Sequence, residues 1–143
     1  MNVFITGASS GIGAALAREF AARGATLGLL ARRADALEAL IAQLPPGRHR
    51  RYVLDVTERA LLLEAARGFE HDSGGADVVI ANAGISVGTL TEYKEDLPVF
   101  ERVLDTNFLA VVDTFHPFVT PMRQRGRGTL AAIANLYAAS VLR

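Results

Sequence analysis

Near its start the chain reads Thr6-Gly7-Ala8-Ser9-Ser10-Gly11-Ile12-Gly13, and this stretch decides the fold. The apolar residues 2–5 directly before it predict a short strand. Residues 14–23 after it are rich in alanine and predict a helix. A strand, a glycine-rich turn and a helix in this order are typical of the opening unit of a nucleotide-binding α/β domain.

The three glycines of this turn have separate physical roles. Gly7 lets the backbone turn sharply off the strand, Gly11 lets it approach a pyrophosphate, and Gly13 lets the helix pack closely. The N–H groups of the first helical turn then face the phosphates, and the helix dipole favours their negative charge. The alternative is a tight turn without a ligand, but the flanking strand and helix favour a binding site. We expect a dinucleotide to be bound here by Gly7, Ser9, Ser10, Gly11, Ile12 and Gly13.

The composition limits the class of protein. The chain has 143 residues, half of them hydrophobic, with a formal net charge of +0 and no cysteine. We therefore expect one domain over residues 1–143, with neither nucleic acid nor a membrane as partner. Disulfides are excluded and the apolar start is too short for a signal peptide, so we expect a cytoplasmic protein. No pair of histidines has metal-ligand spacing, so no metal site is expected.

Apolar strands alternate with amphipathic helices along the rest of the chain. Apolar runs predict strands at 25–31, 51–54, 77–81 and 129–134, and helical periodicity predicts helices at 34–44, 58–70 and 98–125. Thr57 is a candidate N-cap for the helix at 58–70, and Pro117 and Pro121 are candidates to kink or interrupt the last helix. The alternation predicts an α/β fold, a Rossmann-like, doubly wound parallel sheet with helices on both faces.

The spacing of the glycine turn resembles that of one known family. Short-chain dehydrogenases/reductases carry Thr-Gly-x-x-x-Gly-x-Gly, and residues 6–13 match every fixed position. The resemblance covers the chain from Asn2 to about Ala134, and it implies hydride transfer between a nicotinamide cofactor and an alcohol/carbonyl substrate. It also implies a homo-oligomer, because the family commonly associates through the long helix, here about 98–125.

The residues after the second strand indicate which cofactor is bound. Ligands of such sheets bind outside the carboxyl ends of the strands, where an acidic residue would accept hydrogen bonds from the ribose 2′-OH of NAD. Arg32 and Arg33 stand at this position instead. A guanidinium can pair with a 2′-phosphate, and in the resembling family an arginine here implies NADP(H). The alternative is a solvated loop that carries two surface charges.

Three further motifs match the family in order along the chain. Asp55-Val56 matches a dipeptide that contacts adenine, although a lone Asp at a strand end is often a helix cap. Asn82-Ala83-Gly84 matches a motif that stabilises the central sheet and lines the cofactor groove. Asn107 matches a helix asparagine that holds a water in a proton relay, and its alternative is a structural role.

The match to the family fails near the catalytic residues. Asn135 stands where the family has its catalytic Ser. Tyr137 matches the Tyr of Tyr-x-x-x-Lys, but Val141 takes the place of the Lys, and Lys94 is the only lysine in the chain. The family's last strands and substrate-binding region are also missing.

Asn107 and Tyr137 are therefore the candidate catalytic residues. The resemblance implies an NADP(H)-dependent oxidoreductase acting on a small-molecule alcohol or carbonyl compound. Because its Tyr-x-x-x-Lys pair is incomplete, we expect this chain alone to be inactive. The alternative is a non-catalytic dinucleotide-binding module.

Overall fold

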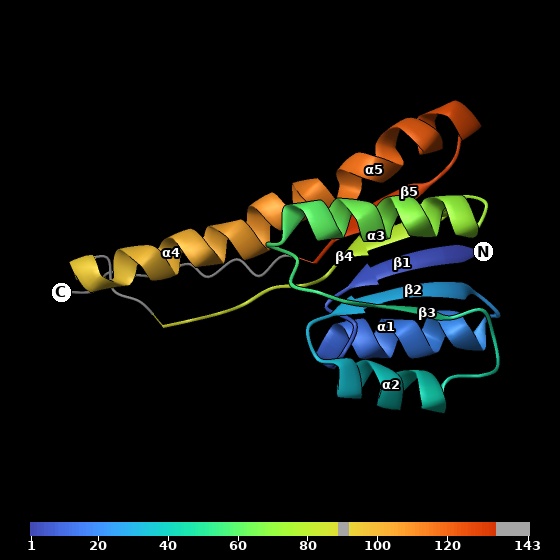
Figure 1. The fold of residues 1–143 in the computed structure, drawn as a ribbon, viewed down its shortest axis with the longest axis horizontal. Helices are drawn as coiled ribbons and strands as arrows, with labels where there is room; N and C mark the ends of the chain where they lie inside the picture. Colours follow the sequence, from blue (N-terminus) through green and yellow to red (C-terminus); the bar gives the residue numbers. More distant parts are fainter. Residues whose placement is uncertain (89–91, 134–143) are drawn as a thin grey trace.

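One parallel sheet organises the computed structural model, which describes residues 1–88 and 92–133. Within these residues five strands lie in the order β3-β2-β1-β4-β5, and every neighbouring pair is parallel. The strands are β1 (Asn2–Thr6), β2 (Thr26–Ala31), β3 (Arg50–Val53), β4 (Val78–Ala81) and β5 (Thr129–Ala132). Their arrows point the same way in Figure 1, so their carboxyl ends share one edge of the sheet. The predicted doubly wound α/β fold is confirmed, and the strand order reverses between β1 and β4.

Helices cover both faces of the sheet. They are α1 (Gly11–Ala22), α2 (Ala34–Gln43), α3 (Arg59–Asp72), α4 (Leu97–Leu104) and α5 (Ala110–Arg125), with a short 3₁₀ turn η1 (Lys94–Asp96) and a π-helical segment η2 (Asp105–Leu109). Figure 1 shows α1 and α2 on one side of the sheet and α3 and α5 on the other. Helix α4 continues the direction of α5 beyond the carboxyl edge of the strands. None of the helices in the described residues is long and apolar enough to cross a membrane.

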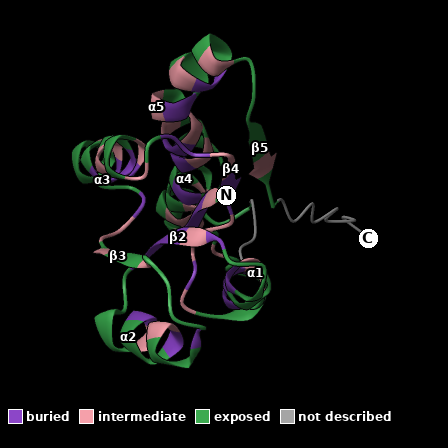
Figure 2. Ribbon diagram, turned by 90° about the vertical axis from the view of Figure 1, so that its right-hand side faces the viewer, coloured by how far each residue is buried: buried purple, intermediate pink, exposed green. Residues whose placement is uncertain are grey.

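An aromatic cluster fills the core between the sheet and the pair α3 and α5. The ring centroid of Phe4 in β1 lies 5.4 Å from those of Phe69 and Phe118. Phe4 is paired in register with Gly28 of β2, and a Cβ on Gly28 would lie 2.7 Å from ring carbons of both Phe4 and Phe69. A second apolar cluster packs α1 and α2 against the opposite face. Buried residues therefore line both faces of the central strands, as Figure 2 shows.

Two helix starts differ from the sequence prediction. Helix α1 begins at Gly11 rather than at residue 14, because Ser10 is extended and acts as its N-cap residue. Two of the turn's glycines therefore lie inside the first helical turn. The prediction that Thr57 caps α3 is wrong, because the Thr57 hydroxyl donates to the Asp55 carboxylate at 2.9 Å. Glu58 is the N-cap residue instead.

The long helical segment reaches from Leu97 to Arg125, close to the predicted 98–125, but its irregularity lies elsewhere. Pro117 and Pro121 both lie within α5 without ending it. Each proline removes one backbone hydrogen bond, and the burial of side chains such as Phe118 keeps this helix packed on the sheet. The regular α geometry is interrupted at η2, and a π turn of this kind often marks a functional position in a helix.

We predict that Gly28→Ala destabilises the protein, because the added methyl overlaps the rings of Phe4 and Phe69. The expected loss is about 1–3 kcal/mol of unfolding free energy, measured by urea denaturation. Gly68→Ala is the matched control, since Gly68 lies inside α3 and a Cβ there meets nothing within 4 Å. That control should be neutral or stabilising by up to about 1 kcal/mol. Equal stability of the two variants would contradict the packing described.

Candidate functional site

The turn after β1 packs directly against the end of β4. Gly7 has a φ of +66°, and a Cβ on it would lie 2.7 Å from the Cα of Ala83. A Cβ on Gly13 would lie 2.6 Å from the Asn82 side-chain nitrogen and would also overlap the Gly7 carbonyl. The start of α1 is thus held against the glycine-rich loop and Asn82. Only glycine permits this close contact at positions 7 and 13.

Hydrogen bonds join the carboxyl ends of the two central strands at the same point. The backbone N–H groups of Asn82 and Ala83 both donate to the Thr6 hydroxyl, each at 3.1 Å. The Asn82 side-chain amide donates to the carbonyls of Thr6 and Gly7, also at 3.1 Å. Thr6 is buried, so these bonds satisfy polar groups that are shielded from water. Asn82 therefore fixes the glycine turn, in keeping with the stabilising role expected for its motif.

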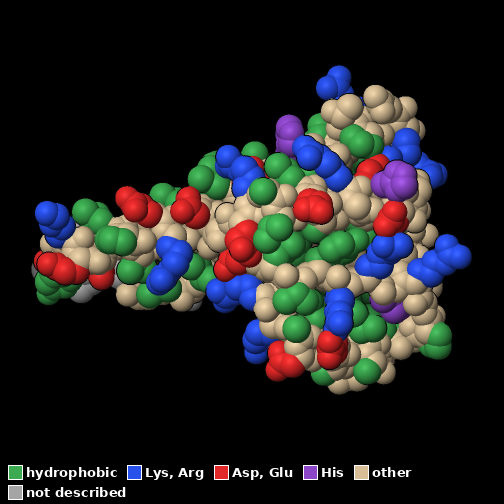
Figure 3. Space-filling view, in the orientation of Figure 1, with side chains coloured by type: hydrophobic (Ala, Val, Ile, Leu, Met, Phe, Trp, Pro, Cys, Tyr) green, Lys and Arg blue, Asp and Glu red, His purple; other side chains and the backbone are tan. Residues whose placement is uncertain are grey.

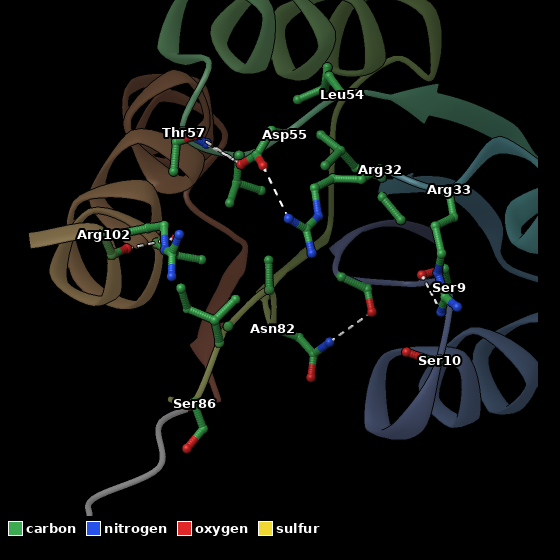
Figure 4. Close-up of a pocket in the computed structure, with 18 of the residues that line it drawn as sticks. Ser9, Ser10, Arg32, Arg33, Leu54, Asp55, Thr57, Asn82, Ser86 and Arg102 are labelled. Carbon is green, nitrogen blue, oxygen red and sulfur yellow. Dashed lines mark hydrogen bonds and ion pairs between the residues drawn. The ribbon is translucent and has the colours of Figure 1, made fainter. Parts of the chain in front are cut away.

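A cavity of about 670 Å³ opens at the carboxyl ends of the strands, beside this junction. Its size is that of a typical small-molecule site, and it lies where the strand order reverses. Ten of the residues expected to bind the cofactor line it, namely Gly7, Ser9, Ser10, Arg32, Arg33, Asp55, Val56, Asn82, Ala83 and Gly84. Residues from the ends of β2, β3 and β4 thus meet the glycine turn that follows β1 in one pocket (Figure 4).

Of the predicted site residues that the structure describes, four lie outside this lining. Gly11 has a φ of +53°, and a Cβ on it would meet nothing within 4 Å, so it leaves open space beside the helix start. Ile12 is 56% exposed and Gly13 is packed against the turn. Asn107 stands behind the pocket wall, as described below. Tyr137, like Asn135, lies outside the described residues.

The two arginines after β2 both reach the pocket, but they have different partners. The Arg32 guanidinium lies 3.5 Å from the Asp55 carboxylate. Arg33 donates to the Ser9 hydroxyl in the glycine turn, also at 3.5 Å. Figure 4 shows Arg32 extending between Asp55 and Asn82, and Arg33 lying over the turn. Positive charge is therefore placed on one side of the pocket, next to the turn expected to bind phosphate.

Asp55 is ionised at neutral pH. Partial burial raises the pKa of its carboxyl, but hydrogen bonds from the backbone and hydroxyl of Thr57 and the charge of Arg32 outweigh burial and lower the pKa below its ordinary value. One carboxylate oxygen accepts both bonds from Thr57, at 3.0 and 2.9 Å. The other oxygen faces Arg32. The loop after β3 is thereby ordered by the same side chain that was expected to contact adenine.

Asn107 clamps the chain that follows Gly84. Its side-chain oxygen accepts the N–H of Ile85 at 2.8 Å, and its side-chain nitrogen donates to the Ile85 carbonyl at 2.9 Å. This asparagine lies in η2, where the π geometry replaces the regular helix. A Cβ on Gly84 would lie 3.4 Å from the Asn107 oxygen, so the two segments are in close contact. The observed bonds fit the structural role left open for Asn107, and its part in a proton relay stays a prediction.

Several lining residues were not found from the sequence. They are Leu30, Ala31, Leu54, Thr57, Ile85, Ser86, Val87, Arg102 and Thr106. Most directly adjoin a predicted motif, and proximity in sequence was a usable signal for those. Arg102 and Thr106 are different, because they come from α4 and η2 and share a helix face at a spacing of four. No sequence pattern shows that this face meets the ends of β3 and β4.

The fold and pocket define a class of protein, the dinucleotide-binding α/β domains of the Rossmann type. Comparison with known families is more specific. The profile of the family described as short chain dehydrogenase matches residues 1–140, and the chain belongs to that family. The resemblance noted in the glycine turn is thereby confirmed.

Individual relatives agree with this assignment. An oxidoreductase of Mycobacterium tuberculosis is 36% identical over 139 residues, which cover 94% of this chain and 54% of that protein. One solved structure is that of an alcohol dehydrogenase from Thermococcus sibiricus complexed with 5-hydroxy-NADP. It has a TM-score of 0.81 at 32% identity, and the match covers 91% of this chain and 56% of that chain. A metagenomic short-chain oxidoreductase in complex with NADP has a TM-score of 0.84 at 28% identity, and the match covers 95% of this chain and 62% of that chain. The chain spans about half the length of the curated relatives it matches.

We predict that Gly13→Val abolishes dinucleotide binding. The branched side chain cannot fit against Gly7 and Asn82, so the helix start must move away from the turn. Isothermal titration with NADPH measures the loss, and circular dichroism verifies that the variant is folded. Ala15→Val, on the exposed side of the same helix, is the control and should bind like the unaltered chain. A folded Gly13→Val variant with unaltered affinity would contradict the assignment of this turn.

Proposed function

We propose that this protein is an NADP(H)-dependent oxidoreductase that transfers a hydride between the cofactor and a small alcohol or carbonyl substrate. The observation that carries the cofactor assignment is the pair Arg32 and Arg33 at the pocket, in the place where NAD-specific sites have an acidic residue. Membership of the short-chain dehydrogenase family supports the reaction class. The names of the relatives favour an oxidoreductase over a non-catalytic binding module.

The volume of the pocket and the two arginines that line it support a phosphorylated dinucleotide as the ligand. Gly7 to Gly13 with the N-terminus of α1 would hold the pyrophosphate, because free N–H groups and the helix dipole favour anions there. Arg32 and Arg33 would bind the 2′-phosphate, and Asp55 with Val56 would face adenine. The wall from Asn82 to Gly84 would then line the nicotinamide half of the groove.

The bound cofactor would supply or accept the hydride, and this chain's residues would position it and handle the proton. Asn107 orders the wall at Ile85 through two hydrogen bonds, and we assign it a part in the proton relay. Tyr137 is the candidate proton donor. The pKa of a free Tyr is about 10, so it needs a neighbouring cation to donate efficiently at neutral pH. Val141 stands where the family has that Lys, which is why the 143 residues alone are proposed to be inactive.

Assembly into a homo-oligomer is part of the same proposal. Leu97, Leu104, Phe108 and Val112 are large apolar residues that are at least half exposed. Their spacings of seven and four place them along one side of the long helical segment. Figure 3 shows hydrophobic side chains on the arm that α4 forms beyond the sheet, among acidic and basic ones. A cytoplasmic location also belongs to the proposal and is supported by the lack of cysteine.

We predict that the unaltered chain binds NADPH about tenfold or more tightly than NADH. One charge-assisted contact to a phosphate is worth about 1.5–3 kcal/mol, which corresponds to a factor of this size. Arg32→Asp combined with Arg33→Ala should reverse the ratio of the two affinities in calorimetric titrations. Arg23→Ala, which lies just after α1, removes a surface charge away from the pocket and serves as control. Tighter binding of NADH by the unaltered chain would overturn the cofactor assignment.

We also predict that the 143-residue chain does not oxidise NADPH in the presence of ketones, aldehydes or quinones. Loss of general acid catalysis costs about 10²–10⁴ in rate, and loss of an oxyanion donor costs about 10²–10³. Absorbance at the NADPH maximum follows turnover, and titration in parallel shows that the cofactor is bound. Tyr137→Phe should leave this background unchanged. Turnover at an ordinary enzymatic rate that Tyr137→Phe abolishes would contradict the prediction.

A further inference from the structure

Two residues that the proposed function assigns to different parts of the cofactor bind each other in this pocket. Arg32, assigned to the 2′-phosphate, lies 3.5 Å from Asp55, assigned to adenine. The two side chains follow neighbouring parallel strands, β2 and β3, so the pair spans the adenine end of the pocket. Figure 4 shows the contact directed across the open space between the two loops.

The local bonding leaves one Asp55 oxygen available for Arg32. Both Thr57 donors go to the same carboxylate oxygen, Oδ1. The Asp55 N–H is bound by the Glu58 carboxylate at 2.9 Å, which further fixes this residue. Oδ2 is the oxygen that faces the Arg32 guanidinium. The loop therefore presents a positioned negative charge to Arg32 before any ligand is bound.

Among the residues that the structure describes, no carboxylate is paired with Arg33 in this way. Its described partner is the neutral Ser9 hydroxyl at 3.5 Å. A dianionic phosphate attracts a guanidinium far more strongly than a hydroxyl does. Arg33 can thus turn to the phosphate at little cost, whereas Arg32 must leave a carboxylate.

We propose that Asp55 is a specificity-determining residue that lowers the preference for NADP(H) by competing with the 2′-phosphate for Arg32. This inference rests on the proposed function. The 2′-phosphate of NADP(H) takes Arg32 from Asp55, because an exposed ion pair at this distance is weak and a charge-assisted phosphate contact is strong. The 2′-hydroxyl of NAD(H) leaves the pair in place. Asp55 therefore limits how strongly Arg32 contributes to the choice between the two cofactors.

Asp55→Asn tests the competition with little change to the loop. The amide oxygen of Asn can still accept from Thr57, while its nitrogen replaces the oxygen that attracts Arg32. The ratio of NADPH to NADH affinity should rise by about two- to fivefold, the range expected when an exposed ion pair no longer competes. Any change in the adenine contact affects both cofactors and cancels in this ratio. Asp55→Ser should give the same rise, and it replaces the first variant if thermal denaturation shows that variant to be unfolded.

The two arginines provide a matched pair of backgrounds. In an Arg32→Ala chain, Asp55→Asn should leave the ratio unchanged, because the residue for which Asp55 competes is gone. In an Arg33→Ala chain, the rise should persist. A rise that survives Arg32→Ala would show that Asp55 acts by repelling the phosphate directly, and this would overturn the proposal.

The outcomes also separate this inference from the proposed function. If the unaltered chain does not prefer NADPH to NADH, the cofactor assignment itself fails. If the preference is present and neither Asp55→Asn nor Asp55→Ser raises it, the assignment stands and the competition is refuted.

Discussion

The contact between the glycine turn and the end of β4 is the constraint on which the rest of the structure depends. Gly7 and Gly13 have no Cβ, so the first turn of α1 can lie against Asn82 and Ala83. Asn82 then ties this turn to the two central strands through bonds to Thr6 and Gly7. Any side chain at either glycine would separate the helix start from the strand ends. The cavity lies beside this junction, and its position relative to α1 follows from the same contact.

The electrostatics of the pocket follow from a second arrangement, the ends of β2 and β3 side by side. Parallel pairing brings the residues after these strands together, so Arg32 meets Asp55 although they are 23 positions apart. The pocket therefore contains a negative charge beside its two arginines. A positioned carboxylate already partners one arginine, while the other contacts a neutral hydroxyl. Residues assigned separately to adenine and to phosphate are physically coupled before a ligand is bound.

The long helical segment contributes to the site through a local departure from α geometry. At η2 the π turn carries Asn107, whose side chain forms both hydrogen bonds to Ile85. The wall from Gly84 to Val87 is thus fixed by a residue from a distant part of the chain. Thr106, the residue before Asn107, and Arg102, about one turn earlier, border the same cavity. The two prolines of α5 are accommodated on a helix whose buried side is packed on the sheet.

The sequence by itself determined the alternation of strands and helices, the glycine turn, and about half of the residues that line the pocket. These features depend on local patterns, namely apolar periodicity, residues without a Cβ, and polar groups placed directly after strands. Only the tertiary structure decided that Arg32 binds Asp55, that Asn107 holds Ile85, and that Arg102 reaches the cavity. It also decided that Thr57 serves Asp55 rather than capping α3. The physical reason is that the first three contacts join elements that are distant in sequence and meet only in the folded chain. For Thr57, two local partners competed, and the folded loop decided between them.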